Sequence, residues 1–442
     1  MITANGLKTR FTRFFSITFF LCYILSLSPQ SLSSTNNKSE ILLQGFDWES
    51  FSNPQGWYNH LLSKVDDFAD LGFTQIWLPP PTYSYDGEGI FPNSRGYIPL
   101  EYYNLNSAYG SIEELKSLII TLKQFNISPL ADLVINHRGK HAGTSNIPVF
   151  SNPDWDLRFF TGGPGMPGLG APDTGAKTDY AYDLDFTNSH VVEYLASWMN
   201  WLKDEIGFEG WRYDFAKGYA GKYVGILNRL TNPKYSIGEY WTNMDFDYLR
   251  LGLNQDRHRQ KIMNWIDSTW KEAGLPSKQA SAAFDFTTKG ILQTAIQKGE
   301  FWRLLDTQSR PPGAIGLWPN KSYTFIDNHD TGSTQNHWPF GNRESIMQGY
   351  VYILTHPGVP TVFWDHLYNL GLYHQIKTLM RLRIKYSIKS DCSIYVLKAQ
   401  DGLYAATIND KITIKLGTNP FTPDGNWSLV ITGFNYSVWE KL

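Results

Sequence analysis

Cysteine is nearly absent from this chain of 442 residues, which contains only Cys22 and Cys392. Cys22 lies in an apolar N-terminal stretch that we expect to be removed, so a mature chain would retain a single cysteine. One cysteine cannot form an internal disulfide, and stability must therefore come from packing. A chain of this length is expected to form two or three structural units.

An excess of either charge is also absent, because 39 Lys and Arg residues face 41 Asp and Glu residues, for a formal net charge of −2. A near-neutral chain lacks the basic surface that binds nucleic acid and the polybasic segment that binds anionic membranes. We therefore expect neither as a partner. Aromatic residues are plentiful at 15%. Most of them suit a large core, and some suit carbohydrate clefts, where flat rings cover the apolar faces of sugars.

The first 34 residues differ in kind from the rest. Lys8, Arg10 and Arg13 precede the apolar run "FFSITFFLCYILSLS", and a serine-rich stretch follows. This order is typical of a cleaved secretory signal, and the apolar run is short for a membrane span of about 20 residues. We predict a signal peptide at 1–34 and a secreted protein; an uncleaved anchor is the alternative. Five N-x-S sequons add weak support for secretion: Asn37, Asn126, Asn320, Asn426 and Asn435.

From residue 35 to 388 short apolar runs alternate with segments of helical periodicity. One such segment, 111–125, opens with Ser111 and Glu114, which form a capping box. Eight runs are strand candidates: 41–48, 73–80, 129–137, 210–215, 235–241, 281–286, 322–328 and 359–364. Eight strands separated by helices predict an α/β protein with a (β/α)8 TIM barrel. An open doubly wound sheet is the alternative, but no glycine-rich phosphate turn follows the first strand.

Two regions interrupt this alternation. Residues 137–188 are rich in Gly, Pro and Asp and are too long for an ordinary loop, so we predict an inserted subdomain after the third strand. From residue 389 the helical period stops, and alternation with period two runs across turns at Asp401-Gly402 and Asn409-Asp410. This pattern predicts a C-terminal antiparallel β-sheet domain over 389–442.

The fourth strand carries an unusual pair of charges. In "GWRYDF", alternation predicts that Arg212 and Asp214 point into the barrel and that Trp211, Tyr213 and Phe215 point outward to the helices. Asp214 lies at the carboxyl end of its strand, where barrel active sites are built. A buried ion pair without a catalytic role is the alternative for these two residues.

Other strand ends favour a site. Acids and histidines follow three strands: Asp132, Asn136 and His137; Glu239; and Asp327, His329 and Asp330. Clustered carboxylates repel one another, and a purely structural rim does not need them. Paired carboxylates beside an Arg and aromatic rings suit glycoside hydrolysis, with one acid as nucleophile and a protonated acid as proton donor. A metallohydrolase would need a ligand set such as His-x-His, which no strand end contains.

Four of these segments, "DLVINH", "GWRYDFAKG", "GEYW" and "FIDNHD", stand in the order typical of one family. From about Leu42 to Leu442 the chain resembles the α-amylase family of glycoside hydrolases, most closely the plant secreted enzymes. The resemblance implies retaining endo-hydrolysis of α-1,4-glucosidic bonds in starch and related glucans. It implies Asp214 as nucleophile, Glu239 as general acid and base, and Asp330 as a third acid that orients the sugar.

The resemblance also implies substrate contacts and a metal site. Arg212 would keep Asp214 ionised, and the remaining substrate-binding residues would be Tyr97, His137, His329, Lys217, Trp48, Trp241 and Gln335. A single calcium ion would be held by Asn136, Asp173 and Asp183 side chains and by the Ala176 and Gly218 carbonyls, an all-oxygen set that suits Ca²⁺. We expect a monomer. A non-catalytic carbohydrate-binding barrel, and an exo-acting glucosidase or transglycosylase on the same fold, remain the alternatives.

Overall fold

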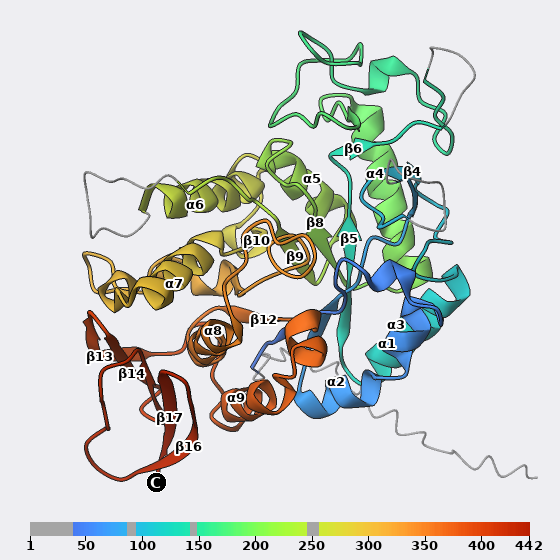
Figure 1. The fold of residues 1–442 in the computed structure, drawn as a ribbon. Coiled ribbons are helices and arrows are strands. Elements are labelled where there is room, and N and C mark those ends of the chain that lie inside the picture. The colour runs from blue at the N-terminus through green and yellow to red at the C-terminus, as the bar shows by residue number, and fades with distance from the viewer. Residues whose placement is uncertain (1–38, 86–93, 142–147, 245–255) are drawn as a thin grey trace, which may run out of the picture. The chain divides into compact units, whose positions relative to one another are not determined.

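The computed structural model describes residues 39–85, 94–141, 148–244 and 256–442 (Figure 1). The signal peptide predicted at 1–34 and the sequon at Asn37 lie outside the described residues. Among the residues that are described, no helix combines the length and the apolar character needed to cross a membrane.

Eight parallel strands close into a barrel, in the spatial order β1, β12, β11, β10, β9, β8, β5, β2. Their side chains are almost all buried, because the barrel interior covers one face of each strand and the helices cover the other. This confirms the predicted (β/α)8 barrel. The strand bounds are Leu42–Gln44 (β1), Gln75–Trp77 (β2), Ser128–Leu133 (β5), Gly210–Tyr213 (β8), Tyr235–Gly238 (β9), Ala282–Phe284 (β10), Ser322–Thr324 (β11) and Val359–Phe363 (β12).

Helices surround the barrel (Figure 1). Trp57, Leu61, Val65 and Phe68 stand at helical spacing, which predicts one helix over 56–72, but the structure divides this segment into two helices. The break falls at Lys64, whose backbone leaves the helical region with φ −116°. The helices are Trp57–Leu62 (α1), Val65–Leu71 (α2), Ile112–Gln124 (α3), Ser189–Trp201 (α4), Gly221–Thr231 (α5), Asp256–Lys271 (α6), Phe286–Lys298 (α7), Arg343–Thr355 (α8) and Tyr373–Lys385 (α9).

Strand β8 shows how the barrel sorts its side chains. Trp211 Nε1 donates to Thr231 Oγ1 at 3.1 Å and Tyr213 hydroxyl donates to Asn228 Oδ1 at 2.8 Å, so both rings face α5. Arg212, between them, points into the barrel and is completely buried. The alternation expected for a strand therefore holds through Tyr213.

A long connection leaves β5 and returns to α4 (Figure 1). It is tied together by a short antiparallel pair, in which His137–Arg138 (β6) faces Tyr182–Asp183 (β7). A second short pair, Tyr83–Ser84 (β3) and Pro99–Glu101 (β4), follows β2. Both pairs lie beyond the carboxyl ends of barrel strands, so they extend the wall above the rim.

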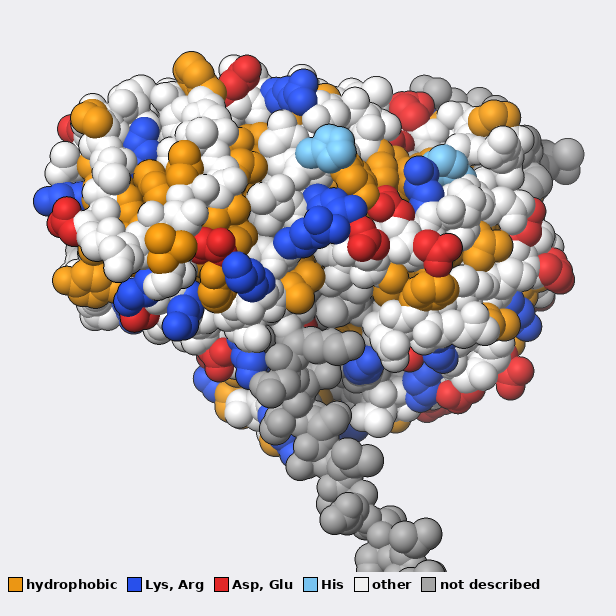
Figure 2. Space-filling view, turned by 90° about the horizontal axis from the view of Figure 1, so that it is seen from below, with side chains coloured by type: hydrophobic (Ala, Val, Ile, Leu, Met, Phe, Trp, Pro, Cys, Tyr) orange, Lys and Arg blue, Asp and Glu red, His pale blue; other side chains and the backbone are white. Residues whose placement is uncertain are grey.

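After the barrel the chain forms a five-stranded antiparallel sheet in the order β13, β14, β15, β17, β16. It contacts α8, where His356 Nε2 lies 2.8 Å from the Tyr404 hydroxyl. Figure 2 shows positive and negative side chains interspersed over the face seen from below, as a net charge of −2 leads one to expect. The sheet strands are Ile394–Gln400 (β13), Leu403–Ile408 (β14), Ile412–Leu416 (β15), Trp427–Gly433 (β16) and Tyr436–Lys441 (β17).

Candidate active site

The guanidinium of Arg212 lies at the centre of a buried acid cluster. Its Nη1 donates to Asp132 Oδ1 and to Asp214 Oδ1, each at 2.7 Å. Its Nη2 lies 2.8 Å from Glu239 Oε1. The guanidinium carbon also lies 4.6 Å from the centre of the Trp77 ring. Three carboxyl groups from β5, β8 and β9 are thus gathered on one cation at the barrel rim.

These carboxyl groups titrate differently from exposed ones. Burial raises the pKa of Asp214 to about 7 and that of Glu239 to about 8, while the Arg212 guanidinium opposes the rise in both. Burial likewise raises the pKa of Asp132 to about 6. Asp330 adds to the rise for both Asp214 and Glu239, because a neighbouring negative charge disfavours ionisation. The acid cluster therefore retains a proton near neutral pH.

Three flat rings stand together beside the acids. Tyr97 and His329 are stacked, with centres 5.2 Å apart, and Trp48 is parallel to both at 6.1 and 5.9 Å. The Tyr97 hydroxyl donates to Asp132 Oδ2 at 3.0 Å. Gln44 Nε2 donates to His329 Nδ1 at 3.0 Å, so Nδ1 is an acceptor and the ring proton is on Nε2. This Nε2 lies 3.5 Å from Asp330 Oδ2. Burial lowers the pKa of His329 to about 4, so its ring is neutral near pH 7.

A cavity of about 430 Å³ opens above the acids and these rings. Its volume lies in the range of pockets that bind small molecules and sugar units. The lining residues are Trp48, Tyr85, Arg95, Tyr97, Ile98, Tyr180, Asp214, Phe215, Lys217, Glu239, Trp241, His329, Asp330 and His337.

Most of the residues predicted for the site, from strand ends or from the family resemblance, come together here. Eight of them line the cavity: Trp48, Tyr97, Asp214, Lys217, Glu239, Trp241, His329 and Asp330. Arg212 lies beneath them and contacts the acids instead of the open space. His137 is fully buried, with Nε2 2.9 Å from the Tyr97 carbonyl and its ring edge-on to Tyr180. Neither His137 nor Gln335 is among the lining residues.

Two expectations about side-chain direction are wrong. Phe215 lines the cavity instead of facing the helices, because β8 ends at Tyr213 and Phe215 adopts a left-handed backbone with φ 44°. Asp327 does not reach the cavity either. It is buried in an ion pair with Lys289 of α7 at 3.1 Å and lies 3.5 Å from His366 Nε2.

Sequence reasoning missed five further lining residues, Arg95, Tyr180, His337, Tyr85 and Ile98. Arg95 lies 4.9 Å from the centre of the Trp48 ring and 4.3 Å from that of Phe51. These residues belong to loops that meet only in the folded chain, so no local pattern marks them. The aromatic ones follow no periodicity that separates them from core residues.

An oxygen-rich cluster lies where the long connection meets the strand β8 turn. Asp173 Oδ2 is buried without a hydrogen-bond partner. Burial and then the neighbouring Asp173 raise the pKa of Asp183 to about 6, although Thr178 donates two hydrogen bonds to it. Asn136 Nδ2 donates to Asp183 Oδ1 at 3.0 Å.

The backbone of Gly218 closes this cluster. A methyl group on Gly218 would lie 2.1 Å from Asn136 Oδ1, so only glycine permits the approach. Ala176 N donates to the Lys217 carbonyl at 3.0 Å and ties the connection to the turn. The described residues contain no group of three or more His, Cys, Asp or Glu side chains arranged for a metal. Two adjacent carboxylates, one with an unsatisfied buried oxygen, nevertheless fit a hard cation.

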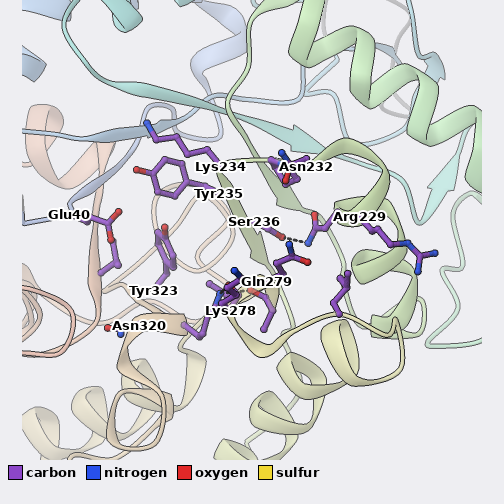
Figure 3. Close-up of a pocket in the computed structure, with 17 residues that line it drawn as sticks. Glu40, Arg229, Asn232, Lys234, Tyr235, Ser236, Lys278, Gln279, Asn320 and Tyr323 are labelled. Carbon is purple, nitrogen blue, oxygen red and sulfur yellow. Dashed lines mark hydrogen bonds between the residues drawn. The ribbon is translucent and has the colours of Figure 1, made fainter. Parts of the chain in front are cut away.

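A second cavity, of about 270 Å³, opens at the amino ends of β9 and β11 (Figure 3). Glu40 is its one carboxylate, and Lys234 and Arg229 extend their charged ends away from the middle of the group. Asn228 Nδ2 donates to Ser236 Oγ at 2.8 Å across one wall. This cavity lies at the opposite end of the barrel from the acid cluster, and it offers no acid pair.

A (β/α)8 barrel whose carboxyl rim gathers an acid pair inside an aromatic cavity defines a glycoside hydrolase. Family models agree: "Alpha amylase, catalytic domain" matches residues 27–159, and "Alpha-amylase C-terminal beta-sheet domain" matches residues 385–440. The chain belongs to the α-amylase family.

Similar proteins place it beside plant members. "Probable alpha-amylase 2" of Arabidopsis thaliana is 44% identical, over 91% of this chain and 94% of its own length. "Alpha-amylase 3, chloroplastic" of the same plant is 41% identical, over 92% of this chain and 45% of its own length. Among solved structures, an α-amylase from Malbranchea cinnamomea has a TM-score of 0.65 at 18% identity, covering 86% of this chain and 85% of its own. That likeness concerns the fold.

Proposed function

We propose that the chain hydrolyses internal α-1,4-glucosidic bonds of starch and related glucans with retention of anomeric configuration. The observation that carries this proposal is the single Arg212 guanidinium that holds Asp214 and Glu239 at the floor of an aromatic cavity. Two carboxyl groups bound to neighbouring nitrogens of one guanidinium are close together, and a short separation of about 5 Å is typical of retaining glycosidases. The names of the Arabidopsis relatives support starch as the substrate class.

In this mechanism Asp214 is the nucleophile and Glu239 the proton donor. Asp214 attacks the anomeric carbon while Glu239 transfers its proton to the oxygen of the departing glucan. Glu239, now ionised, takes a proton from a water molecule, which attacks the same carbon and releases Asp214. Burial raises the pKa of both acids toward neutral pH, which supports one proton shared by the pair, as a proton donor beside a nucleophile requires.

The remaining polar groups act on the sugar. Asp330 lines the cavity and would accept hydrogen bonds from sugar hydroxyls. The neutral Nε2–H of His329 would donate to one of them. Tyr97, Trp48 and Trp241 offer ring faces to the sugar, and Lys217 offers its ammonium. Gln335, which lies outside the lining, is proposed to bind the sugar on the family resemblance alone. His137 contributes through Tyr97, whose carbonyl it contacts.

We also propose a calcium ion bound by Asn136, Asp173 and Asp183 and by the carbonyls of Ala176 and Gly218. Calcium there would neutralise the adjacent carboxylates and join the long connection to the turn that carries the nucleophile. The support is the buried, unpartnered Asp173 Oδ2 and the raised pKa of Asp183.

We further propose that the protein is secreted after removal of residues 1–34 and acts as a monomer. The proposed domain limits are 35–388 for the barrel, 137–188 for the subdomain inserted in it, and 389–442 for the sheet domain. The basic and apolar pattern of the N-terminus and the change of periodicity at 389 are what support them.

The product profile on soluble starch tests the catalytic proposal. Wild type is expected to release a ladder of short α-anomeric oligosaccharides, detected by chromatography and by proton NMR of the fresh anomers. Asp214→Asn is expected to release none, while Asp424→Asn, an exposed aspartate of the C-terminal sheet, keeps the ladder. Glucose alone, released from chain ends, would contradict endo-action, and β-anomers would contradict retention.

A further inference from the structure

The proposed third acid belongs to a loop that folds back on itself. Asp330 carbonyl accepts from His337 N, and Thr331 carbonyl accepts from Trp338 N, each at 3.1 Å. The amide of Asn328 turns inward and binds the backbone of the same turn through Oδ1, at 3.1 Å to Asp330 N. The position of Asp330 and His337 at the cavity is therefore mechanically linked to the position of Trp338.

A row of polar side chains on helix α7 forms hydrogen bonds with this loop. Three residues spaced four apart lie on one face of the helix and each donates to a loop carbonyl. The pairs are Lys289 Nζ to Trp338 O at 2.9 Å, Gln293 Nε2 to Pro339 O at 2.6 Å, and Gln297 Nε2 to Phe340 O at 3.1 Å.

Lys289 is the most constrained member of the row. Its ammonium is completely buried, and its other two partners are Asp327 Oδ1 at 3.1 Å and Gln293 Oε1 at 3.4 Å. Three partners match the three protons of an ammonium group. Its Nζ also lies 4.6 Å from the centre of the Trp338 ring. Burial lowers the pKa of Lys289 while Asp327 opposes this, so the charge persists because it is paired.

Asp327 accepts hydrogen bonds from both ends of the loop. Its Oδ1 accepts from Thr331 Oγ1 at 2.9 Å, and its Oδ2 accepts from Phe340 N at 3.1 Å. Trp338 also packs beside Trp241, which lines the cavity: the two rings are nearly parallel, with centres 6.5 Å apart. Lys289 thus contacts the beginning and the end of the segment that presents Asp330.

We infer that Lys289 is a positioning residue for catalysis: through Asp327 and the Trp338 carbonyl it holds the 328–340 loop so that Asp330 and His337 face the reacting sugar. This inference rests on the proposed function, because it assigns Asp330 a catalytic task. It concerns the arrangement of the third acid and adds no contact between Lys289 and substrate.

Lys289→Met tests it, with Lys298→Met, at the exposed end of the same helix, as the matched control. Measured on a soluble maltooligosaccharide well below the melting temperature, kcat is expected to fall about 10-fold or more with KM nearly unchanged, since small misplacements of catalytic groups lower the rate strongly. The control is expected to keep both constants. A variant that melts earlier but keeps wild-type kcat would overturn the inference.

Substitution of Asp330 separates this inference from the proposed function. In an Asp330→Asn background Lys289→Met is expected to lower kcat little further, because the residue it positions is already lost. If Asp330→Asn alone is fully active, the proposed role of Asp330 fails. If Asp330→Asn is impaired and Lys289→Met lowers kcat by the same factor in both backgrounds, the positioning role fails.

A second variant keeps the test decisive if Lys289→Met does not fold. Gln293→Leu removes the bond to the Pro339 carbonyl and the 3.4 Å contact of Gln293 Oε1 with Lys289 Nζ, but it leaves Lys289 paired with Asp327. It is expected to lower kcat in the same direction by a smaller factor. The double variant Lys289→Met/Asp327→Asn removes both buried charges at once. If both Gln293→Leu and this double variant keep the wild-type kcat, the inference is overturned.

Discussion

A histidine buried between the barrel and the C-terminal sheet should make the protein sensitive to mild acid. His356 is completely buried, with its ring 3.8 Å from the centre of Tyr352 and its Nε2 2.8 Å from the Tyr404 hydroxyl. Burial lowers its pKa to about 3. No carboxylate is bonded to it among the described residues, while Arg383 lies near enough to oppose protonation.

The sign and size of the effect follow from linkage. The unfolded chain binds a proton at His356 below its ordinary pKa of about 6.5, and the folded chain does not until about pH 3. The free energy of unfolding is therefore unaffected by His356 above pH 6.5 and decreases as the pH falls from 6.5 toward 3. At pH 5 protonation of His356 stabilises the unfolded state by about 2 kcal/mol, since each pH unit below 6.5 contributes about 1.36 kcal/mol.

His356→Gln removes this term and keeps polar atoms at the site. The substitution is expected to cost stability at pH 7, because the ring packed on Tyr352 is lost. The difference between variant and wild type should then shrink by about 2 kcal/mol at pH 5, while other titrating groups cancel in the comparison. Urea unfolding followed by tryptophan fluorescence at both pH values measures it. His374→Gln, an exposed histidine of α9, is the control. An equal difference at pH 7 and pH 5 would refute the reasoning.

Two further predictions concern the site itself. A chelator such as EDTA should lower the melting temperature and the activity together, because the oxygen cluster would lose its cation. Asp173→Asn should reproduce both losses without chelator. A melting temperature that does not change in excess chelator would contradict the calcium proposal. Because the Asp214 and Glu239 pair titrates near pH 7 to 8, kcat/KM should fall on the alkaline side, where the pair loses the proton that must be donated, and on the acid side, where both carboxyl groups are protonated. Glu239→Gln should abolish the alkaline limb, and a limb that persists in this variant belongs to another group.

The strands were predictable because each is a short apolar run bounded by turn residues. Their count, together with the lack of a glycine-rich phosphate turn after the first strand, favoured a closed barrel over an open sheet. The acids were predictable for a related reason. Asp214, Glu239 and Asp330 follow strands, and parallel strands of a barrel end at one rim. The break within 56–72 was not predictable, because the apolar spacing continues across Lys64, where the backbone leaves the helical region.

Side-chain direction beyond a strand end could not be read from alternation. Phe215 turns into the cavity because its backbone is left-handed, and Asp327 turns away because Lys289 binds it from a helix 38 positions earlier in the sequence. His137 and Gln335 were expected in the cleft on family resemblance, and the structure places neither among the lining residues. Loop residues such as Arg95 and Tyr180 line the cavity through contacts between segments far apart in sequence.

The amino-acid sequence by itself determined the class of fold, the two interruptions of the alternation and the residues that can carry acid and base chemistry, because hydrophobic period and residue type are local properties. Only the tertiary structure decided which of the acids share the Arg212 guanidinium, how burial raises the pKa values of Asp214 and Glu239, and which helix binds the loop of Asp330. These depend on distances between chain segments and on exclusion of water, which no run of residues contains.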